Sequence, residues 1–483
     1  MIIVMSSSCH PHDHHHTKSP EPTSVLYNRS PSPPTSSSLG SCSSKPLTTT
    51  ADDWEAVLGD MVTPAALPQD SSFLRWIMDA GYADGDGDGD AFGFKGPAFP
   101  DPFDSLLPPP PQDDPPQAQA QALVDELLDA ARRLHAGDST SAMGILARLN
   151  HRLPSLPPPG HPPLLRAAAL LRDALLRLLQ PTALPHQASV SSPLDVPLKL
   201  AAHKALADAS PTVQFASFTS TQAFLDALGA ARRVHLLDFD IGFGGHWPPL
   251  MQELAHQWRR AAVPLPPPTL KVTALVSPGT RHPLELHLTY ESLTRFAAEL
   301  GIAFEFTALA FDPLSASPPM GLADEAVAVH LPAGSATFSP APAHLRVVKE
   351  LRPAVVVCVD HGCERGDLPL PHHALNLLRS SAALLESLDT AGASPDVVSK
   401  IEQFILRPRV EHLALGGDKL PPLQSMFASG GFAPLQLSNA AEAQAECLLR
   451  RTANHGFHVE KRQAALALWW QRSELVSVSA WRC

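Results

Sequence analysis

The chain has 483 residues and a formal net charge of −12; 44% of its residues are hydrophobic and 17% are charged. This length suits one large or two ordinary domains, and the acidic balance argues against a broad phosphate-binding surface, because non-specific affinity for nucleic acid comes from Lys and Arg. The six cysteines lie far apart except for one pair, which predicts reduced thiols in a cytosolic or nuclear protein. The opening MIIVM is too short for a signal peptide and lacks its basic lead. No apolar run approaches the roughly 20 residues of a membrane span, so we expect a soluble protein with no membrane contact.

Residues 1–118 are rich in Ser, Pro, His, Asp and Gly and contain few branched apolar residues. Such a segment cannot bury enough apolar surface to offset the entropy lost on ordering, so we expect a disordered N-terminal region. Two islands, residues 52–60 and 71–82, place aromatic and aliphatic side chains among acids, a pattern typical of segments that fold on a partner and also of chance. The run 84–90 begins like an EF-hand loop, but Lys95 stands where the bidentate Glu is required. We interpret this run as an acidic linker without a metal.

The pattern changes near Gln121, where apolar residues begin to recur at helical spacing. The helical runs are residues 121–134, 164–178 and 203–228. The Pro-rich stretch LPSLPPPGHPP between the first two must be a loop. We therefore expect a helical cap over residues 119–230.

From about residue 231, short apolar runs alternate with helical ones. The strand candidates are residues 234–240, 269–277, 302–309, 325–331 and 354–360. Apolar strands separated by helices predict a parallel sheet covered on both faces. At the end, residues 457–470 and 474–481 are joined by the polar QRS and predict an antiparallel hairpin on the sheet edge. The expected fold is α/β: a Rossmann-like, class I methyltransferase-like sheet with an antiparallel C-terminal hairpin, its core spanning residues 231–483 below the α-helical cap.

One stretch, RVHLLDFDIGFGGHWPPLMQELA (residues 233–255), has the layout of a cofactor site. An apolar strand runs into two acids and a glycine-rich turn, and Pro248 suits the start of the helix that follows. In a doubly wound sheet the ligand crevice lies beside this turn. Asp240, Gly242 and Gly244 match the D-x-G-x-G pattern of methyltransferases that use S-adenosylmethionine (SAM), so they are the candidate cofactor contacts.

Other features of the same stretch argue against a cofactor. His246 replaces the third glycine of the methyltransferase pattern, and Trp247 replaces that of the dinucleotide fingerprint. Both side chains would crowd the place of the cofactor. The second strand, which ends near Val276, is not followed by the carboxylate that usually holds the ribose hydroxyls. We therefore expect no cofactor and no catalytic residue here.

The turn then has a structural role. We expect the carboxylates of Asp238 and Asp240 to accept hydrogen bonds from backbone amides of the turn. The expected core positions of the strand are Val234, Leu236 and Phe239, and the expected buried anchors are Trp247 and Trp481.

A second polar stretch, CVDHGCERGD (residues 358–367), follows a predicted strand. Zinc would need four ligands at defined spacing, and this stretch lacks a second pair. A Cys–His nucleophile would need a base and an oxyanion hole that the sequence does not place. We interpret the stretch as a polar loop after a buried strand and expect no metal.

Several motifs, in a fixed order, resemble those of the GRAS family of plant transcriptional regulators, from about Gln121 to Cys483. Leucine-rich helices precede a VHIID-like motif at Val234, His235, Leu236, Leu237 and Asp238. The segment GGFAPLQLSNAAEAQAECLLRR of this chain resembles the one that precedes the last hairpin in this family. The end of the chain is similar to the family's SAW motif at Trp470, Leu475, Ser479, Ala480 and Trp481. The PFYRE region departs from the family: its usual Phe and Tyr are missing, and only Arg409 and Glu411 echo the RE pair.

The segments SVLYNRSPSPPTSSS, DDWEAVLGD, SSFLRWIMD and KIEQFILRPRVEH are similar to the HAIRY MERISTEM (scarecrow-like) branch of that family. The resemblance implies a nuclear regulator without established catalysis, which docks onto DNA-binding transcription factors, plausibly of the homeodomain type, in shoot meristem maintenance. It implies mostly indirect contact with DNA and leaves a homo- or heterodimer open. The acidic charge and the lack of a Lys/Arg cluster in the sequence agree with docking. The alternatives are a SAM-dependent methyltransferase that uses Asp240, Gly242 and Gly244, and a sequence-specific DNA-binding domain.

Overall fold

The computed structural model describes residues 3–5, 115–153, 160–180, 192–261, 268–276, 280–311, 324–361, 368–415, 421–452 and 455–483. The two aromatic islands and the acidic run 84–90 lie outside the described residues, so their predictions stay predictions. Within the expected disordered region, the structure describes one short strand, β1 (Ile3–Met5), which the sequence pattern did not predict because three residues are too few to show periodicity. The first described helix begins at Pro115.

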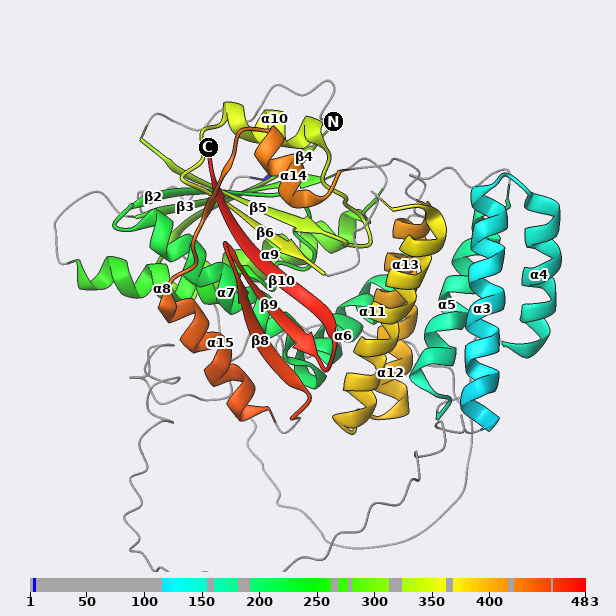
Figure 1. The fold of residues 1–483 in the computed structure, drawn as a ribbon. Coiled ribbons are helices and arrows are strands. Elements are labelled where there is room, and N and C mark those ends of the chain that lie inside the picture. The colour runs from blue at the N-terminus through cyan, green and yellow to red at the C-terminus, as the bar shows by residue number, and fades with distance from the viewer. Residues whose placement is uncertain are drawn as a thin grey trace, which may run out of the picture. The chain divides into compact units, whose positions relative to one another are not determined.

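The core of the described chain is a ten-stranded mixed sheet in the order β1-β4-β3-β2-β5-β6-β10-β9-β8, with β7 paired to β10 (Figure 1). The strands after β1 are β2 (Arg233–Asp238), β3 (Thr269–Val276), β4 (Ala303–Ala310), β5 (Ala326–Ala333), β6 (Val355–Asp360), β7 (Ala433–Leu435), β8 (Phe457–Arg462), β9 (Ala465–Trp470) and β10 (Ser473–Arg482). Strands β2 to β6 pair in parallel. This confirms the predicted Rossmann-like sheet and all five predicted parallel strands.

The antiparallel end of the sheet is larger than predicted. The expected single strand over residues 457–470 is two strands, β8 and β9, because the chain turns at Gln463, whose φ is 38°. The predicted hairpin is present between β9 and β10, with Gln471 in its turn at φ 50°. Strand β10 pairs on its other side with β6, where Val478 lies opposite Val359. The last strand is therefore inserted between β6 and β9 rather than placed on the edge.

Helices cover both faces of the sheet. The helices of the described chain are α3 (Pro115–His135), α4 (Ser139–Arg152), α5 (Pro163–Leu178), α6 (Asp195–Ala209), α7 (Pro211–Leu228), α8 (Trp247–Arg260), α9 (Pro283–Leu300), α10 (Pro342–Glu350), α11 (Leu370–Thr390), α12 (Pro395–Ile401), the π-helix η1 (Glu402–Leu406), α13 (Arg407–Leu415), α14 (Leu423–Ser429) and α15 (Asn439–Arg451). Helix α7 packs against β5, β6, β9 and β10 and is flanked by α8 and α15. A second apolar cluster joins the sheet to α10 and α14 and includes Leu237, Val348, Phe427 and Trp481.

A separate helical layer lies beside the sheet, at the right of Figure 1. Helices α3, α4 and α5 pack together, and α11 and α13 pack against α5. The layers thus do not follow the division expected at residue 230, because α7 lies on the sheet while residues 370–415 join the cap. The leucine-rich α5 has buried side chains on most of its circumference, so it needs partners on both sides and obtains them from two distant parts of the chain.

In the described part of the chain, no helix combines the length and apolar character required to cross a membrane.

Candidate functional site

The candidate site lies where the order of the parallel strands reverses direction. From β2 the chain continues to β3 and β4 on one side, and β5 and β6 lie on the other. In open α/β sheets the ligand crevice forms at this switch point, outside the carboxyl ends of the strands. Here Asp238, the last residue of β2, lies opposite His330 of β5 in the parallel register. The glycine-rich turn, residues 240–246, begins two residues after Asp238, at the carboxyl end of β2.

Asp238 is fully buried, and its carboxylate accepts three hydrogen bonds. Its Oδ1 accepts from the backbone amide of Asp240 at 3.0 Å and from Nδ1 of His330 at 2.9 Å. Its Oδ2 accepts from the indole Nε1 of Trp247 at 3.0 Å. The prediction that Asp238 bonds a backbone amide of the turn is therefore confirmed. A buried carboxylate needs such donors, since charge without them is costly to remove from water.

The two bulky side chains that replace glycines lie against His330. The ring centroids of His246 and His330 are 5.2 Å apart, and those of Trp247 and His330 are 5.6 Å apart. Trp247 is 1% exposed, as expected of a buried anchor, and its ring also contacts Phe224 of α7. Imidazole and indole rings therefore pack at the switch point.

Asp240 differs from the expectation that its carboxylate bonds the amides of the turn. Its Oδ1 forms an ion pair with Arg281, and its Oδ2 accepts from Oγ1 of Thr337 at 2.7 Å. Arg281 also pairs with Glu285 of α9 at 3.3 Å, and Glu285 accepts from Nζ of Lys199 of α6 at 3.0 Å. The turn is thus joined to two helices by charged groups that are largely buried. The sequence could not predict this, because Arg281 and Asp240 are 41 residues apart.

The two glycines of the turn have distinct structural reasons. Gly242 and Gly244 have φ of 56° and 73°, a region that side-chain-bearing residues rarely adopt. A Cβ at Gly244 would lie 3.0 Å from Cγ2 of Thr289 and 3.1 Å from Cδ1 of Leu293, both on α9. Thr289 also donates its hydroxyl to the carbonyl of Gly242 at 3.1 Å. The glycines therefore allow α9 to pack directly on the turn.

Burial keeps His246 and His235 uncharged at neutral pH. Burial first, and the neighbouring His330 second, lower the pKa of His246 to about 4 against the opposing effect of Asp238. Burial also lowers the pKa of His235 to about 4, with Lys271 acting in the same direction and Glu325 against it. Neutral rings of this kind pack and hydrogen bond.

The VHIID-like motif forms strand β2. Val234, Leu236, Leu237 and Phe239 are buried, which confirms the predicted core positions of the stretch, with Phe239 lying just after the strand. His235 is fully buried, and its Nε2 is 2.8 Å from Oγ1 of Thr273 on β3. The motif therefore holds β2 between its two neighbours.

The SAW-like motif closes the sheet. Trp481 is 6% exposed and stacks on Phe427 of α14, with ring centroids 4.4 Å apart and an interplanar angle of 5°. Its Nε1 donates to the hydroxyl of Ser479 at 3.0 Å. Trp481 is thus a buried anchor, as predicted. The other buried residues of the motif are Trp470, Leu475 and Ala480.

Trp470 has a separate contact. Its ring lies edge-on to Phe457 at 4.7 Å and directly over Gly456, where a Cβ would approach the ring to 2.4 Å. Any side chain at residue 456 would therefore displace Trp470 from the end of β9.

The stretch 358–367 is only partly described. Cys358 is buried in β6, and the carbonyl of His361 accepts from Nη2 of Arg409 at 2.6 Å. Residues 362–367, including Cys363, lie outside the described part of the chain. Where the structure does describe side chains, no group of three or more His, Cys, Asp or Glu residues could hold a metal.

Sequence reasoning missed a row of ion pairs between α5 and the helices that follow α12. Arg166, which is 5% exposed, donates to Glu402 of η1 at 2.6 Å and to Asp389 of α11 at 3.1 Å. Two and three turns further along α5, Asp173 accepts from Arg407 at 2.7 Å, and Arg177 pairs with Glu411.

The charges alternate along the two facing helices: basic, acidic and basic on α5, and acidic, basic and acidic from η1 to α13. The spacing of i, i+7 and i+11 on α5 could have indicated a polar seam, but its partners are more than 220 residues away. The two residues that echo the RE pair have different partners. Glu411 belongs to this row of ion pairs, and Arg409 donates to the backbone carbonyl of His361, just after β6.

Comparison with known proteins identifies relatives over the described domain. The GRAS domain family matches residues 123–482. Scarecrow-like protein 6 of Arabidopsis thaliana is 44% identical over 370 residues, which cover 75% of this chain and 63% of that protein. Scarecrow-like protein 22 of the same plant is 40% identical over 391 residues, covering 76% and 62%. The chain spans about three fifths of the length of these curated relatives.

A solved structure shares the fold. The crystal structure of SCL7 in Oryza sativa superposes with a TM-score of 0.57 at 27% identity and covers 74% of this chain and 99% of that one.

Proposed function

Because the chain belongs to the GRAS domain family, we propose that it is a nuclear regulator of transcription that acts as a non-enzymatic scaffold between other proteins. The support from the structure is the filled switch point. Asp238 accepts hydrogen bonds from His330 and Trp247 there, and Asp240, the acid of the methyltransferase-like pattern, is engaged by Arg281 and Thr337. A SAM site would have to break a buried ion pair first, at a cost of several kcal/mol.

The proposed partners are DNA-binding transcription factors, with the homeodomain type as the first candidate. The choice of partner follows from the resemblance to the HAIRY MERISTEM branch, which also implies a role in shoot meristem maintenance. The helical layer offers exposed helix faces for a partner, or for a homo- or heterodimer, and the N-terminal islands offer short contact segments. Contact with DNA would then be mostly indirect.

The net charge of the domain alone gives less support to indirect DNA contact than the net charge of the whole chain does. Residues 1–114 hold 16 acidic and 5 basic residues, a net −11, which leaves 32 acidic and 31 basic residues in 115–483, a net −1. The domain itself is thus almost neutral. Direct DNA binding therefore has to be separated from docking by experiment.

A gel-shift assay separates these functions. The full chain is added to a labelled duplex that carries a homeodomain site, with and without the homeodomain protein. We expect a supershift only when the homeodomain protein is present and none on a duplex with a mutated site. A salt-dependent shift by the chain alone would favour direct DNA binding.

Calorimetric titration of the full chain with SAM tests the enzyme alternative. We expect no binding at micromolar SAM. Micromolar affinity that disappears in the near-isosteric Asp240→Asn variant, with folding intact, would revive the methyltransferase function and contradict a filled crevice.

A further inference from the structure

The division of charge between the two parts of the chain has a counterpart on the surface of the domain. The acidic excess is densest in residues 84–90, where four of seven residues are Asp. On the domain, Arg346 and Lys349 are exposed on α10, and Arg352 is exposed just beyond its end. The sequence predicts no Lys/Arg cluster, but these three residues are spaced by three and so lie on one side of the helix and of the turn that follows it.

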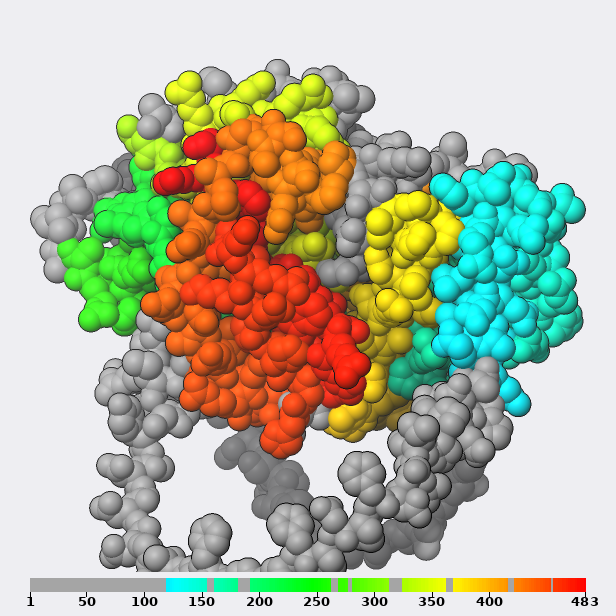
Figure 2. Space-filling view, viewed as in Figure 1, coloured from blue at the N-terminus to red at the C-terminus, as the bar shows by residue number. Residues whose placement is uncertain are grey.

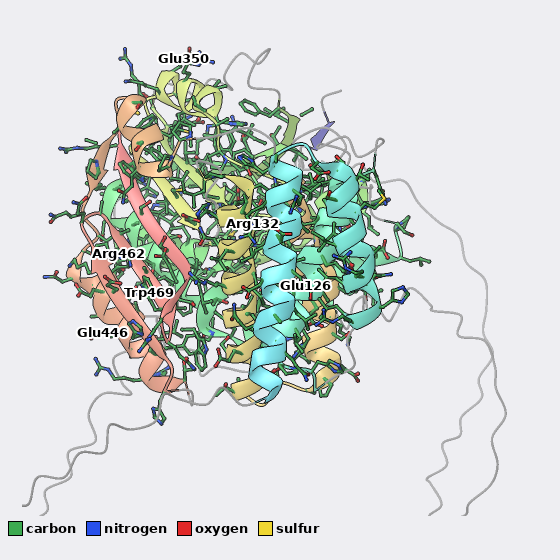
Figure 3. The ribbon with its side chains drawn as sticks, turned by 45° about the vertical axis from the view of Figure 1, so that its right-hand side comes forward. Glu126, Arg132, Glu350, Glu446, Arg462 and Trp469 are labelled. Atoms are coloured by element: carbon green, nitrogen blue, oxygen red, sulfur yellow. The ribbon has the colours of Figure 1, made fainter. Side chains whose placement is uncertain are left out.

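These cations line a shallow basin of about 840 Å³, together with Glu350, Pro353 and Cys483. Nζ of Lys349 donates to the carbonyl of Gly430 at 2.7 Å, which fixes the ammonium at the rim. Burial raises the pKa of the Cys483 thiol, and the nearby Lys349 opposes that rise, so the C-terminal residue lies within reach of the Lys349 charge. Figure 2 shows the C-terminal residues (red) at the surface beside α10 (yellow-green), and Figure 3 shows Glu350 projecting from α10 at the top of the molecule.

None of the three basic side chains forms an ion pair with any residue that the structure describes. Three positive charges face two carboxylates, the side chain of Glu350 and the terminal carboxylate of Cys483, which leaves the surface net positive. Like charges held this close repel one another, so an anionic partner gains both attraction and relief of that repulsion.

We propose that this basic basin binds the acidic run of the same chain, residues 84–90. Four carboxylates within seven residues match a site that presents three cations, and the tether makes the encounter intramolecular, with an effective concentration in the millimolar range for short linkers and lower for longer ones. The proposal goes beyond the scaffold function and does not depend on it.

The connection is long enough to reach. Residues 91–114 separate the run from α3, and 24 extended residues span at most about 80 Å. A compact domain of 369 residues (115–483) has a diameter of about 55 Å. A path around half of such a domain is about 86 Å, so the run can reach most of the surface of the domain and reaches its far side only when the linker is fully extended.

The size of the basin favours an acidic peptide over nucleic acid. A DNA-binding surface neutralises roughly 6 to 10 phosphates, whereas this basin has three cations opposed by the carboxylates of Glu350 and Cys483. A single short acidic segment satisfies it.

Zero-length cross-linking of the full chain tests the proposal. A carbodiimide joins a carboxylate to a lysine amine only when the two are in contact, so Lys349 should form an amide with the aspartates of residues 84–90, detected as a linked peptide by mass spectrometry. The control lysine is Lys400, which is exposed on α12. We expect the Lys349 product to fall roughly fivefold or more at 1 M salt, because the screening length drops to about 3 Å.

Two variants complete the test. Replacing the four aspartates by Asn (Asp84→Asn, Asp86→Asn, Asp88→Asn, Asp90→Asn) should abolish the Lys349 product without touching the domain. Arg346→Glu with Arg352→Glu should also abolish it, whereas Arg259→Glu with Arg260→Glu, at the exposed end of α8, should leave it unchanged.

Equal yields at Lys349 and Lys400, or a Lys349 product that survives the four Asn substitutions, would overturn the proposal. So would a duplex-DNA gel shift that requires Arg346 and Lys349 while no cross-link forms, since the basin would then belong to nucleic acid. The supershift and SAM results can fail without affecting any of these outcomes.

Discussion

Asp238 and His330 are paired residues of adjacent parallel strands, and the 2.9 Å hydrogen bond between their side chains lies at the point where the strand order of the sheet reverses. In relatives of this architecture that bind ligands, the crevice opens here. In this chain the same position holds a buried carboxylate that accepts hydrogen bonds from an imidazole and an indole. The site therefore stabilises the sheet from within.

Asp238→Ala should destabilise the domain by about 3 to 5 kcal/mol, because three donors lose a buried acceptor at once. Urea denaturation of the full chain measures the change in unfolding free energy. The matched control is Asp208→Ala on α6, an exposed acid paired only with Lys204 at 3.7 Å, for which we expect less than about 0.5 kcal/mol. A cost below about 1 kcal/mol for Asp238→Ala would mean that the three bonds do not stabilise the fold.

Asp240 and Arg281 should be energetically coupled. In a double-mutant cycle with Asp240→Asn and Arg281→Met, we expect a coupling energy of about 1 to 3 kcal/mol, since both side chains are largely buried. The same cycle on the exposed pair Arg450 and Glu446 should give at most about 0.5 kcal/mol. Additive effects at Asp240 and Arg281 would show that the ion pair does not hold the turn to α9.

The elements that sequence predicts well are those with local patterns. The parallel strands are short apolar runs. The turn after β2 is indicated by Gly242 and Gly244, whose positive φ values are local requirements of the backbone. The anchors Trp247 and Trp481 were predictable because large aromatic residues at strand and helix ends are usually buried. Local patterns can also mislead: residues 457–470 look like one strand in the sequence, and the pattern does not indicate the turn at Gln463.

The partners of charged residues could not be predicted in the same way. Arg281 reaches Asp240 across 41 positions, and Arg166 reaches Glu402 across 236. Nothing in the periodicity of either segment specifies such a pairing, because it depends on how distant helices are brought together. The expected cap of residues 119–230 differed from the structure for the same reason: α5 packs on α11 and α13, which come from the far half of the chain.

Trp481→Ala should cost about 3 to 5 kcal/mol, because the indole fills the space between β10 and α14 and stacks on Phe427. Trp469→Ala is the comparison on the neighbouring strand: Trp469 is only half-buried, and Figure 3 shows it near Arg462 on the β8–β9 hairpin, where the two side chains form a cation–π contact at 4.6 Å, so we expect a smaller loss than in Trp481→Ala. Thermal unfolding followed by circular dichroism compares the two. Retained melting temperature with lost partner binding in Trp481→Ala would make this residue a contact surface instead of an anchor.

Arg166→Met should weaken the junction between the helical layer and the core by about 2 to 4 kcal/mol. The substitution removes the cation that donates to the buried carboxylate of Glu402 and leaves it with Arg407 alone, and burial already raises the pKa of Glu402 against the lowering effect of Arg166. Arg177→Met removes an arginine from the same face of α5, but its side chain is 46% exposed, so we expect at most about 1 kcal/mol. Limited proteolysis between α4 and α5, together with denaturation, locates the effect, and equal losses in the two variants would contradict the importance of burial along this seam.

Mild acid should destabilise the domain through its buried histidines. Burial lowers the pKa of His235 and of His246 from 6.5 to about 4 in the folded chain, so the unfolded state binds protons first as the pH falls. The stability that these neutral rings contribute is fully present above pH 6.5 and is lost progressively between pH 6.5 and 4. Since each pKa unit corresponds to about 1.4 kcal/mol, the fully buried His235 alone should account for a loss of about 2 kcal/mol between pH 6.5 and 5. Urea denaturation at a series of pH values measures this slope; His235→Asn should flatten it, whereas His287→Asn, on the exposed face of α9, should not. A slope that is unchanged in His235→Asn would show that the ring is not held neutral by the fold.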